Sequence, residues 1–181
     1  AVTIDGRSDT NDDTLILRTE AGADVVTLEP GANFDSGVFH INASAGSEAP
    51  PSLTFRGLGE DSFIQLLSGL AGNREDTFEY RGTAVTDTFT VTAANGGTID
   101  LNLRKEIRAA GIANLSLQGL GGDDIFNLTG ALPFTNTVID GGSSANDVVN
   151  LSGPTGPVSI NLATLAVTGY GGTVGLIGVE T

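Results

Sequence analysis

The stretch QGLGGDDIFNL, residues Gln118–Leu128, decides the fold predicted for this chain. Two glycines stand two residues apart, and Asp123 and then the apolar Ile125 follow at the same spacing. An earlier stretch, RGLGEDSFI at Arg56–Ile64, repeats the pattern, and both copies follow a short strand of alternating apolar residues. The predicted unit is therefore a strand, a glycine turn, an aspartate and a second strand. A recurring unit of this kind indicates the architecture of the whole chain.

Short strands are predicted along the whole sequence, because apolar and polar residues alternate over stretches of four to six residues. The strand before each glycine turn recurs near residues 4, 55, 80, 117 and 139. These intervals approximate one or two turns of a coil of about 25 residues. They predict a single all-β domain over residues 1–181, wound as a right-handed parallel β-helix of irregular coils. The alternative is an antiparallel β-sandwich, although a sandwich gives no reason for the same unit to return at this interval.

One further sequence pattern marks the start of strands. It reads D-x-φ-x-φ, where φ is apolar, and it begins at Asp13, Asp24, Asp76, Asp87, Asp124 and Asp147.

One segment, Arg104–Ala110 (RKEIRAA), has a helical composition and is predicted to form a short inserted helix that ends at Gly111. Its cations Arg104, Lys105 and Arg108 are the one basic cluster of the sequence. The cluster indicates either a contact for an acidic polymer or a neighbouring subunit, or a solvated turn with internal ion pairs.

The composition excludes several classes of function. The 22 Asp and Glu residues outnumber the 8 Lys and Arg residues, and the net charge of −14 argues against a nucleic-acid partner. The absence of Cys excludes disulfides, thiol catalysis and Cys-bound zinc. No apolar run is long enough for a membrane-spanning helix. We interpret the chain, which begins at Ala1, as a mature form or a segment of a larger exported bacterial protein, located outside the cell or on its surface.

The two glycine turns resemble the nonapeptide G-G-x-G-x-D-x-U-x of the RTX, or haemolysin-type, calcium-binding repeats, where U is a large apolar residue. Each copy matches four of the five defined positions, and the two copies lie 62 residues apart instead of in tandem. In that family, turn carbonyls and the aspartate bind calcium together with the next repeat. The resemblance implies that Asp61 and Asp123 are calcium ligands. More broadly, the chain resembles stalk or passenger segments of bacterial surface proteins.

Stacked turns would place aspartates in a column along one edge of the coils. Carboxylates about 5 Å apart repel each other unless a cation bridges them, and calcium prefers six to eight oxygen ligands. Alternatively, the same side chains cap backbone amides in tight turns. The candidate metal ligands are Asp13, Asp61, Asp87, Asp123, Asp124 and Asp147.

These features favour a non-enzymatic structural or adhesive module of an exported bacterial surface protein, stabilised by Ca²⁺. Its expected partners are other segments of the same protein or neighbouring subunits, together with extracellular polysaccharide. The first alternative is a polysaccharide lyase, epimerase or hydrolase on a β-helix, since glycoside hydrolysis needs only two carboxylates. The second is a module whose folding or secretion is triggered by calcium.

Overall fold

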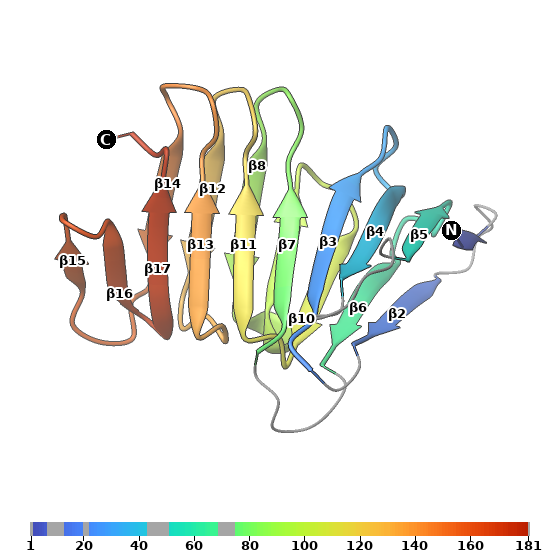
Figure 1. Cartoon of the computed structure of the whole chain (residues 1–181), viewed down its shortest axis with the longest axis horizontal. Coiled ribbons are helices and arrows are strands. Elements are labelled where there is room, and N and C mark those ends of the chain that lie inside the picture. The colour runs from blue at the N-terminus through green and yellow to red at the C-terminus, as the bar shows by residue number, and fades with distance from the viewer. Residues whose placement is uncertain (1, 7–12, 20–21, 43–50, 69–74, 181) are drawn as a thin grey trace.

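The computed structural model describes residues 2–6, 13–19, 22–42, 51–68 and 75–180. Over these residues the chain forms 17 strands in two sheets, together with one short 3₁₀ turn, η1 (Ala94–Gly96). The prediction of an all-β protein is confirmed. Figure 1 shows the strands side by side along the long axis, with β1 and β15 at opposite ends.

Each sheet is defined by its strand order. Sheet A runs β1 (Val2–Asp5), β5 (Ser52–Arg56), β4 (Gly37–Asn42), β3 (Val25–Pro30), β7 (Thr77–Arg81), β11 (Asn114–Gln118), β13 (Asn136–Asp140), β17 (Gly172–Ile177), β16 (Ala166–Tyr170) and β15 (Ser159–Asn161). Sheet B runs β14 (Val148–Ser152), β12 (Ile125–Thr129), β8 (Thr88–Thr92), β9 (Thr98–Leu101), β10 (Glu106–Ala110), β6 (Phe63–Leu67) and β2 (Thr14–Arg18).

Parallel stacking dominates the middle of the molecule. The chain passes from sheet A to sheet B three times in succession, as β7–β8, β11–β12 and β13–β14, and each strand lies parallel to its counterpart in the neighbouring pair. In sheet A the register aligns Tyr80 with Leu117 and Leu117 with Ile139. In the same sheet Ile4 aligns with Phe55. The strands that the sequence placed near residues 80, 117 and 139 are therefore neighbours, as are those near residues 4 and 55.

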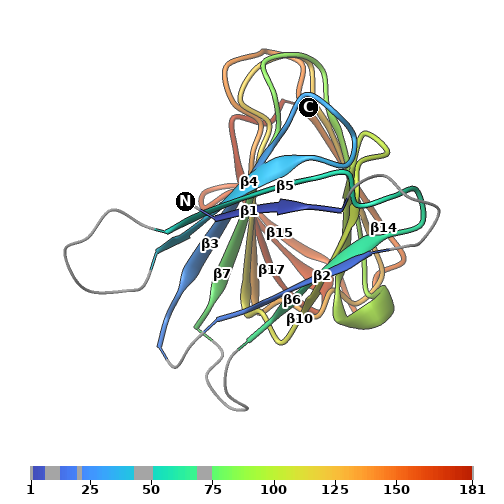
Figure 2. The same cartoon turned by 90° about the vertical axis from the view of Figure 1, so that its right-hand side faces the viewer.

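Antiparallel strands interrupt the stack, so both sheets are mixed. Strand β4 pairs antiparallel with β3 and β5, and β3 and β4 together separate the strands near residues 55 and 80. Strand β9 lies between β8 and β10 and is antiparallel to both. Strands β15 and β16 add an antiparallel hairpin at one end of sheet A. Figure 2 shows the same strands from the β1 end.

The helix predicted over Arg104–Ala110 is wrong, because this segment contains strand β10. Ile107 and Ala109 face the core while Glu106 and Arg108 face outward, which is the two-residue period of a strand. Strand β10 pairs along its whole length with β6. Burial in the sheet outweighs the weak helical propensity of its residues.

One hydrophobic core lies between the sheets, because both contribute buried residues to the same cluster. Phe89 and Phe126 occupy aligned positions on neighbouring strands, and their rings stack with centroids 5.0 Å apart and planes 6° from parallel. Aromatic pairs of this kind add about 0.5–1.5 kcal/mol to the stability from burial alone. Stacked apolar side chains therefore hold successive strand pairs together.

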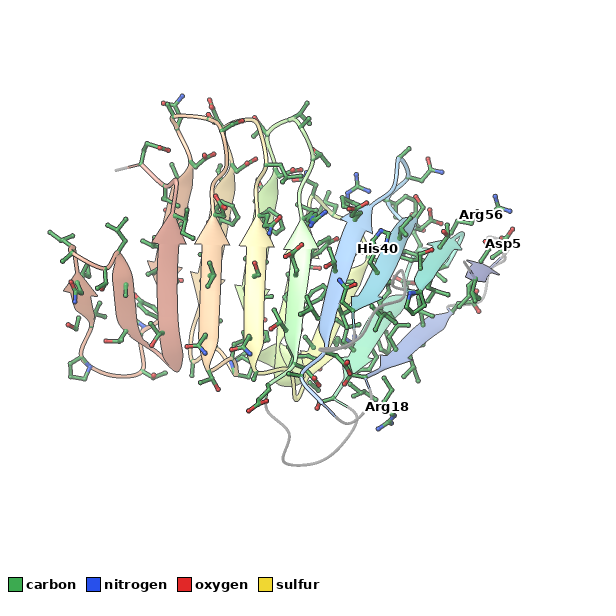
Figure 3. The ribbon with its side chains drawn as sticks, in the orientation of Figure 1. Asp5, Arg18, His40 and Arg56 are labelled. Carbon is green, nitrogen blue, oxygen red and sulfur yellow. The ribbon has the colours of Figure 1, made fainter. Side chains whose placement is uncertain are left out.

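At the β1 end, Asp5, Arg18, His40 and Arg56 lie on the outside of the molecule, as Figure 3 shows. Arg56 bonds to Asp5 through a 2.8 Å contact between neighbouring strands. The single histidine, His40, lies on β4 with its Nε2 3.7 Å from the carboxylate of Glu29. This outward position agrees with the strand pattern around it.

Candidate functional site

Acidic side chains form a continuous hydrogen-bonded series across the amino-terminal ends of β8, β12 and β14 in sheet B, which we call the carboxylate ladder. The Asp87 amide donates to Asp124 Oδ1 over 2.7 Å, and the Asp124 amide donates to Asp147 Oδ1 over the same distance. The Asp147 amide in turn donates to Glu180 Oε2 over 3.0 Å. Each carboxylate thus satisfies a backbone amide of the preceding strand pair. The three aspartates are fully buried.

The sequence pattern D-x-φ-x-φ accounts for the position of these aspartates. All six residues that begin this pattern immediately precede a strand: Asp13, Asp24, Asp76, Asp87, Asp124 and Asp147. Asp76 forms an equivalent link between segments, because its Oδ1 accepts the amide of Asp24 over 3.0 Å. These bonds stabilise the fold, because a buried backbone N–H that lacks a hydrogen-bond acceptor costs free energy.

The glycines that precede Asp124 and Asp147 in the turns, Gly119 and Gly141, are required by close packing. A Cβ at Gly119 would collide with Asp124 Oδ2 and with the carbonyl oxygen of Gly141. Gly141 is crowded in the same way by Asp147. The turn glycine therefore allows the neighbouring carboxylate to lie against the backbone.

Two oxygens of the ladder lack a partner. Asp124 Oδ2 and Asp147 Oδ2 are buried and accept no hydrogen bond among the described residues. Asp87 differs, because its carboxylate accepts from Asn102 Nδ2 and, over 3.0 Å, from Thr83 Oγ1. Burial raises the pKa of Asp124 to about 6, and the carboxylates of Asp87 and Asp147 act in the same direction. The hydrogen bond from the Asp87 amide opposes this shift.

The other candidate ligands lie outside this series. Asp123 is exposed and accepts hydrogen bonds from Ser144 and Asn146, which lower the pKa of its carboxyl. Asp61 is also exposed, and the buried Ser62 occupies the strand-preceding position beside it. Asp13 precedes β2 at the opposite end of sheet B.

The two RTX-like aspartates, Asp61 and Asp123, are thus the exposed neighbours of the residues that precede strands. Within the described part of the chain, no group of three or more His, Cys, Asp or Glu side chains is close enough to hold a metal ion. Calcium binding at the candidate ligands stays a prediction.

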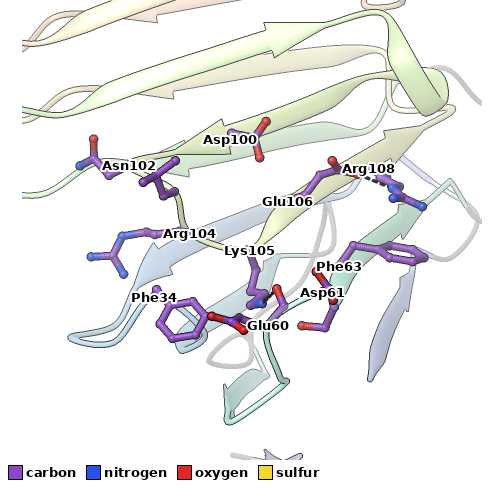
Figure 4. A pocket seen from close by; sticks show the side chains of 12 residues that line it. Phe34, Glu60, Asp61, Phe63, Asp100, Asn102, Arg104, Lys105, Glu106 and Arg108 are labelled. Atoms are coloured by element: carbon purple, nitrogen blue, oxygen red, sulfur yellow. Dashed lines mark hydrogen bonds and ion pairs between the residues drawn. The ribbon is translucent and has the colours of Figure 1, made fainter. Parts of the chain in front are cut away.

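A second candidate site is a cleft of about 530 Å³ on the outer side of sheet B (Figure 4). Its lining mixes acidic, basic and aromatic side chains, which come from β6, β9, β10 and the loops beside them: Phe34, Glu60, Asp61, Phe63, Asp100, Asn102, Leu103, Arg104, Lys105, Glu106 and Arg108, together with Ser62. Its volume lies within the range of ligand-binding pockets.

Two carboxylates on neighbouring strands face the cleft. Strands β9 and β10 pair antiparallel with Ile99 opposite Ile107, and continuing this register places Asp100 opposite Glu106. Partial burial raises the pKa of Asp100, and the nearby charge of Glu106 raises it further. The Glu106 side chain bonds to Arg108, whereas the carboxylate of Asp100 forms no hydrogen bond or ion pair with any described residue. Asp100 is therefore an acidic group left free to meet a ligand.

The cations of the cleft are held by the protein itself. Lys105 is buried, and its Nζ donates to the carbonyl of Gly59 and, over 2.6 Å, to that of Glu60. Arg104 donates to the carbonyl of Gly31 over 2.8 Å. Arg108 lies over the ring of Phe63, 3.6 Å from its centroid. The predicted basic cluster is thus a set of internal links.

Sequence reasoning missed the cleft. Its acidic pair depends on the antiparallel insertion of β9, which no repeat spacing indicates. The alternation in the segment Glu106–Ala110 was the available signal, since reading it as a strand places Glu106 and Arg108 on one outer face.

The chain matches no family model, no curated protein and no solved structure in the comparisons made. Among the described residues, none of the helical segments has the length and apolar character needed to cross a membrane.

Proposed function

We propose that the chain is a non-enzymatic structural and adhesive module of an exported bacterial surface protein, wound as a right-handed parallel β-helix with hairpin insertions. The observation that carries this proposal is the carboxylate ladder, which repeats the same amide-to-carboxylate bond from one strand pair to the next. A structure in which each unit contacts mainly its neighbours gains stability from such repeated links. Right-handed winding is proposed because crossovers between parallel strands of one sheet take that hand in nearly all proteins.

The ends of the sheets support contacts with other segments of the same protein or with neighbouring subunits. Strand β15 is an edge strand of sheet A, and Ile160 on it has 62% of its surface exposed. Unpaired strand edges with apolar side chains are common sites of strand addition. A location outside the cell or on its surface belongs to the same proposal.

Calcium enters the proposal as a stabiliser of the acidic turns. The buried oxygens of Asp124 and Asp147 that lack a hydrogen-bond donor, and the exposed carboxylates of Asp61 and Asp123, are the groups whose charge it would offset. Thermal unfolding in EDTA and then in millimolar calcium tests this part. A rise in Tm with calcium supports calcium binding. An unchanged Tm contradicts calcium binding but not the scaffold proposal.

The scaffold itself is tested by hydrogen exchange on the variant Asp147→Ala. We expect faster amide exchange in β12 and β14 on both sides of the broken link, because the Asp124 amide loses its acceptor. The non-enzymatic part is tested by incubating the chain with neutral and acidic polysaccharides and measuring the products of hydrolases and lyases. Exchange confined to residue 124, or release of any product, would overturn the proposal.

A further inference from the structure

Two hollows meet at Asp100 on the outer side of sheet B. The cleft of about 530 Å³ and a neighbouring hollow of about 690 Å³ share three lining residues, Asp100, Asn102 and Leu103. The second hollow continues over Thr88 and Thr90 of β8. Together they form a groove that crosses several strands, with Asp100 at its centre.

The charge available in this groove is negative. Arg104 and Lys105 donate to backbone carbonyls, and Arg108 is paired with Glu106. The side-chain carboxylates of Asp61 and Asp100, in contrast, form no hydrogen bond or ion pair with any other described residue. The groove therefore suits a ligand that brings positive charge and hydrogen-bond donors, and an acidic polymer would meet repulsion.

Apolar surface lies beside these acceptors. Phe34 has 49% of its surface exposed at the edge of the cleft, and Leu103 has 94% exposed where the two hollows meet. Exposed apolar side chains next to polar groups are typical of a binding surface. A sugar ring fits this combination, because its C–H face is apolar and its edge carries hydrogen-bond donors.

Polar side chains extend from Asp100 along the sheet in a straight row. Asp100 aligns with Thr90 on β8, Thr90 with Asn127 on β12, and Asn127 with Asn150 on β14. The two asparagine side chains are joined by a 3.0 Å hydrogen bond. Neighbouring strands lie about 4.8 Å apart, so the row offers polar groups at a constant interval. A polymer with repeating hydroxyl groups matches such a row better than a peptide with varied side chains.

We propose that this groove binds an oligosaccharide that carries free amino groups, such as an oligomer of glucosamine. The ammonium groups contact Asp100 and Asp61, a sugar ring covers Phe34, and further sugars follow the row from Thr90 towards Asn150. This inference deepens the adhesive part of the proposed function and rests on it.

The test is isothermal titration calorimetry of the whole chain with glucosamine oligomers. We expect binding that weakens as salt is added, because charge pairs contribute. The variant Asp100→Asn should bind at least about tenfold more weakly, which corresponds to about 1.4 kcal/mol. The variant Phe34→Ala should also bind more weakly. The matched control Glu75→Gln removes the charge of an exposed carboxylate outside the groove and should bind as the unaltered chain does.

Circular dichroism of each variant must show an unchanged fold. The inference is overturned by three results: no binding of glucosamine oligomers, equal binding of N-acetylated or uronic acid oligomers, or tighter Asp100-dependent binding of a lysine-rich peptide. Failure to bind would leave the scaffold proposal intact. Cleavage of a bound oligomer would keep the binding site and would overturn the non-enzymatic function.

Discussion

Asp124 has one oxygen that accepts an amide hydrogen bond and one that has no partner in the described structure. Burial raises the pKa of its carboxyl from 3.8 to about 6. The folded state therefore binds this proton more tightly than the unfolded state does. From this group we expect the free energy of unfolding to fall as the pH rises from about 4 to about 6, by at most about 3 kcal/mol. Urea unfolding at a series of pH values measures this change.

The variant Asp124→Asn isolates the contribution of this group. The asparagine Oδ1 can still accept from the Asp87 amide, but the side chain no longer ionises. We expect the variant to lose stability less steeply than the unaltered chain between pH 4 and 6. Glu75→Gln is the control, since its carboxylate is exposed and outside the carboxylate ladder. Equal pH slopes for Asp124→Asn and the unaltered chain would contradict the assignment.

Gly119 is a position where one added methyl group should be costly. The new Cβ would collide with Asp124 Oδ2 and with the Gly141 carbonyl oxygen, so the side chain and the backbone around it must shift. We expect Gly119→Ala to lower the free energy of unfolding by about 1–3 kcal/mol. Gly156→Ala is the matched control, because nothing lies within 4 Å of its added Cβ. Similar urea midpoints for the two variants would show that crowding at Gly119 is unimportant.

At the scale of elements, Lys105 joins the start of β10 to the turn before β6. Its ammonium donates to the carbonyls of Gly59 and Glu60, and its side chain is buried. Lys105→Met keeps most of the apolar stem but leaves these carbonyls without their donor. We expect a loss of about 1–3 kcal/mol in the free energy of unfolding. The comparison is Arg18→Met on the exposed end of β2, where we expect a change within about 0.5 kcal/mol.

Sequence spacing predicted the elements that repeat and failed for those that interrupt the repeat. The alignment of the strands near residues 80, 117 and 139 follows from one recurring unit, which strands β9 and β10 lengthen between Tyr80 and Leu117. Hairpin β3–β4 and strand β9 are insertions, and their pairing depends on which sheet edge is free. No local pattern contains that information.

The same distinction holds for the candidate sites. The positions of Asp87, Asp124 and Asp147 at one edge follow from the stacked strands that they precede. Asp124 faces inward and Asp123 faces outward, because successive side chains at the start of β12 alternate between the two sides of the sheet. The RTX-like spacing indicated Asp123, which is the exposed residue of the two. Asp100 and Glu106 lie together only because β9 reverses direction.

Over the whole molecule, sheet A continues beyond sheet B at one end. Strands β16 and β15 extend sheet A past β17, whereas sheet B ends at β14 (Figure 1). Val167 is buried, but its cross-strand partner Ile160 is 62% exposed because no strand of sheet B covers it. The apolar interior is therefore open at this end of the described structure. Such an opening favours association through the ends over association through the charged sides.

The net charge of −14 acts on the whole molecule as a repulsion that folding must overcome. Salt screens this repulsion, so at pH 7 we expect Tm to rise as sodium chloride is increased from about 0.01 M to about 0.5 M in the presence of EDTA. Near pH 4 many exposed carboxylates take up protons, and the same addition should raise Tm less. If sodium chloride raised Tm equally at the two pH values, the stabilisation would come from stronger burial of apolar surface and not from charge screening.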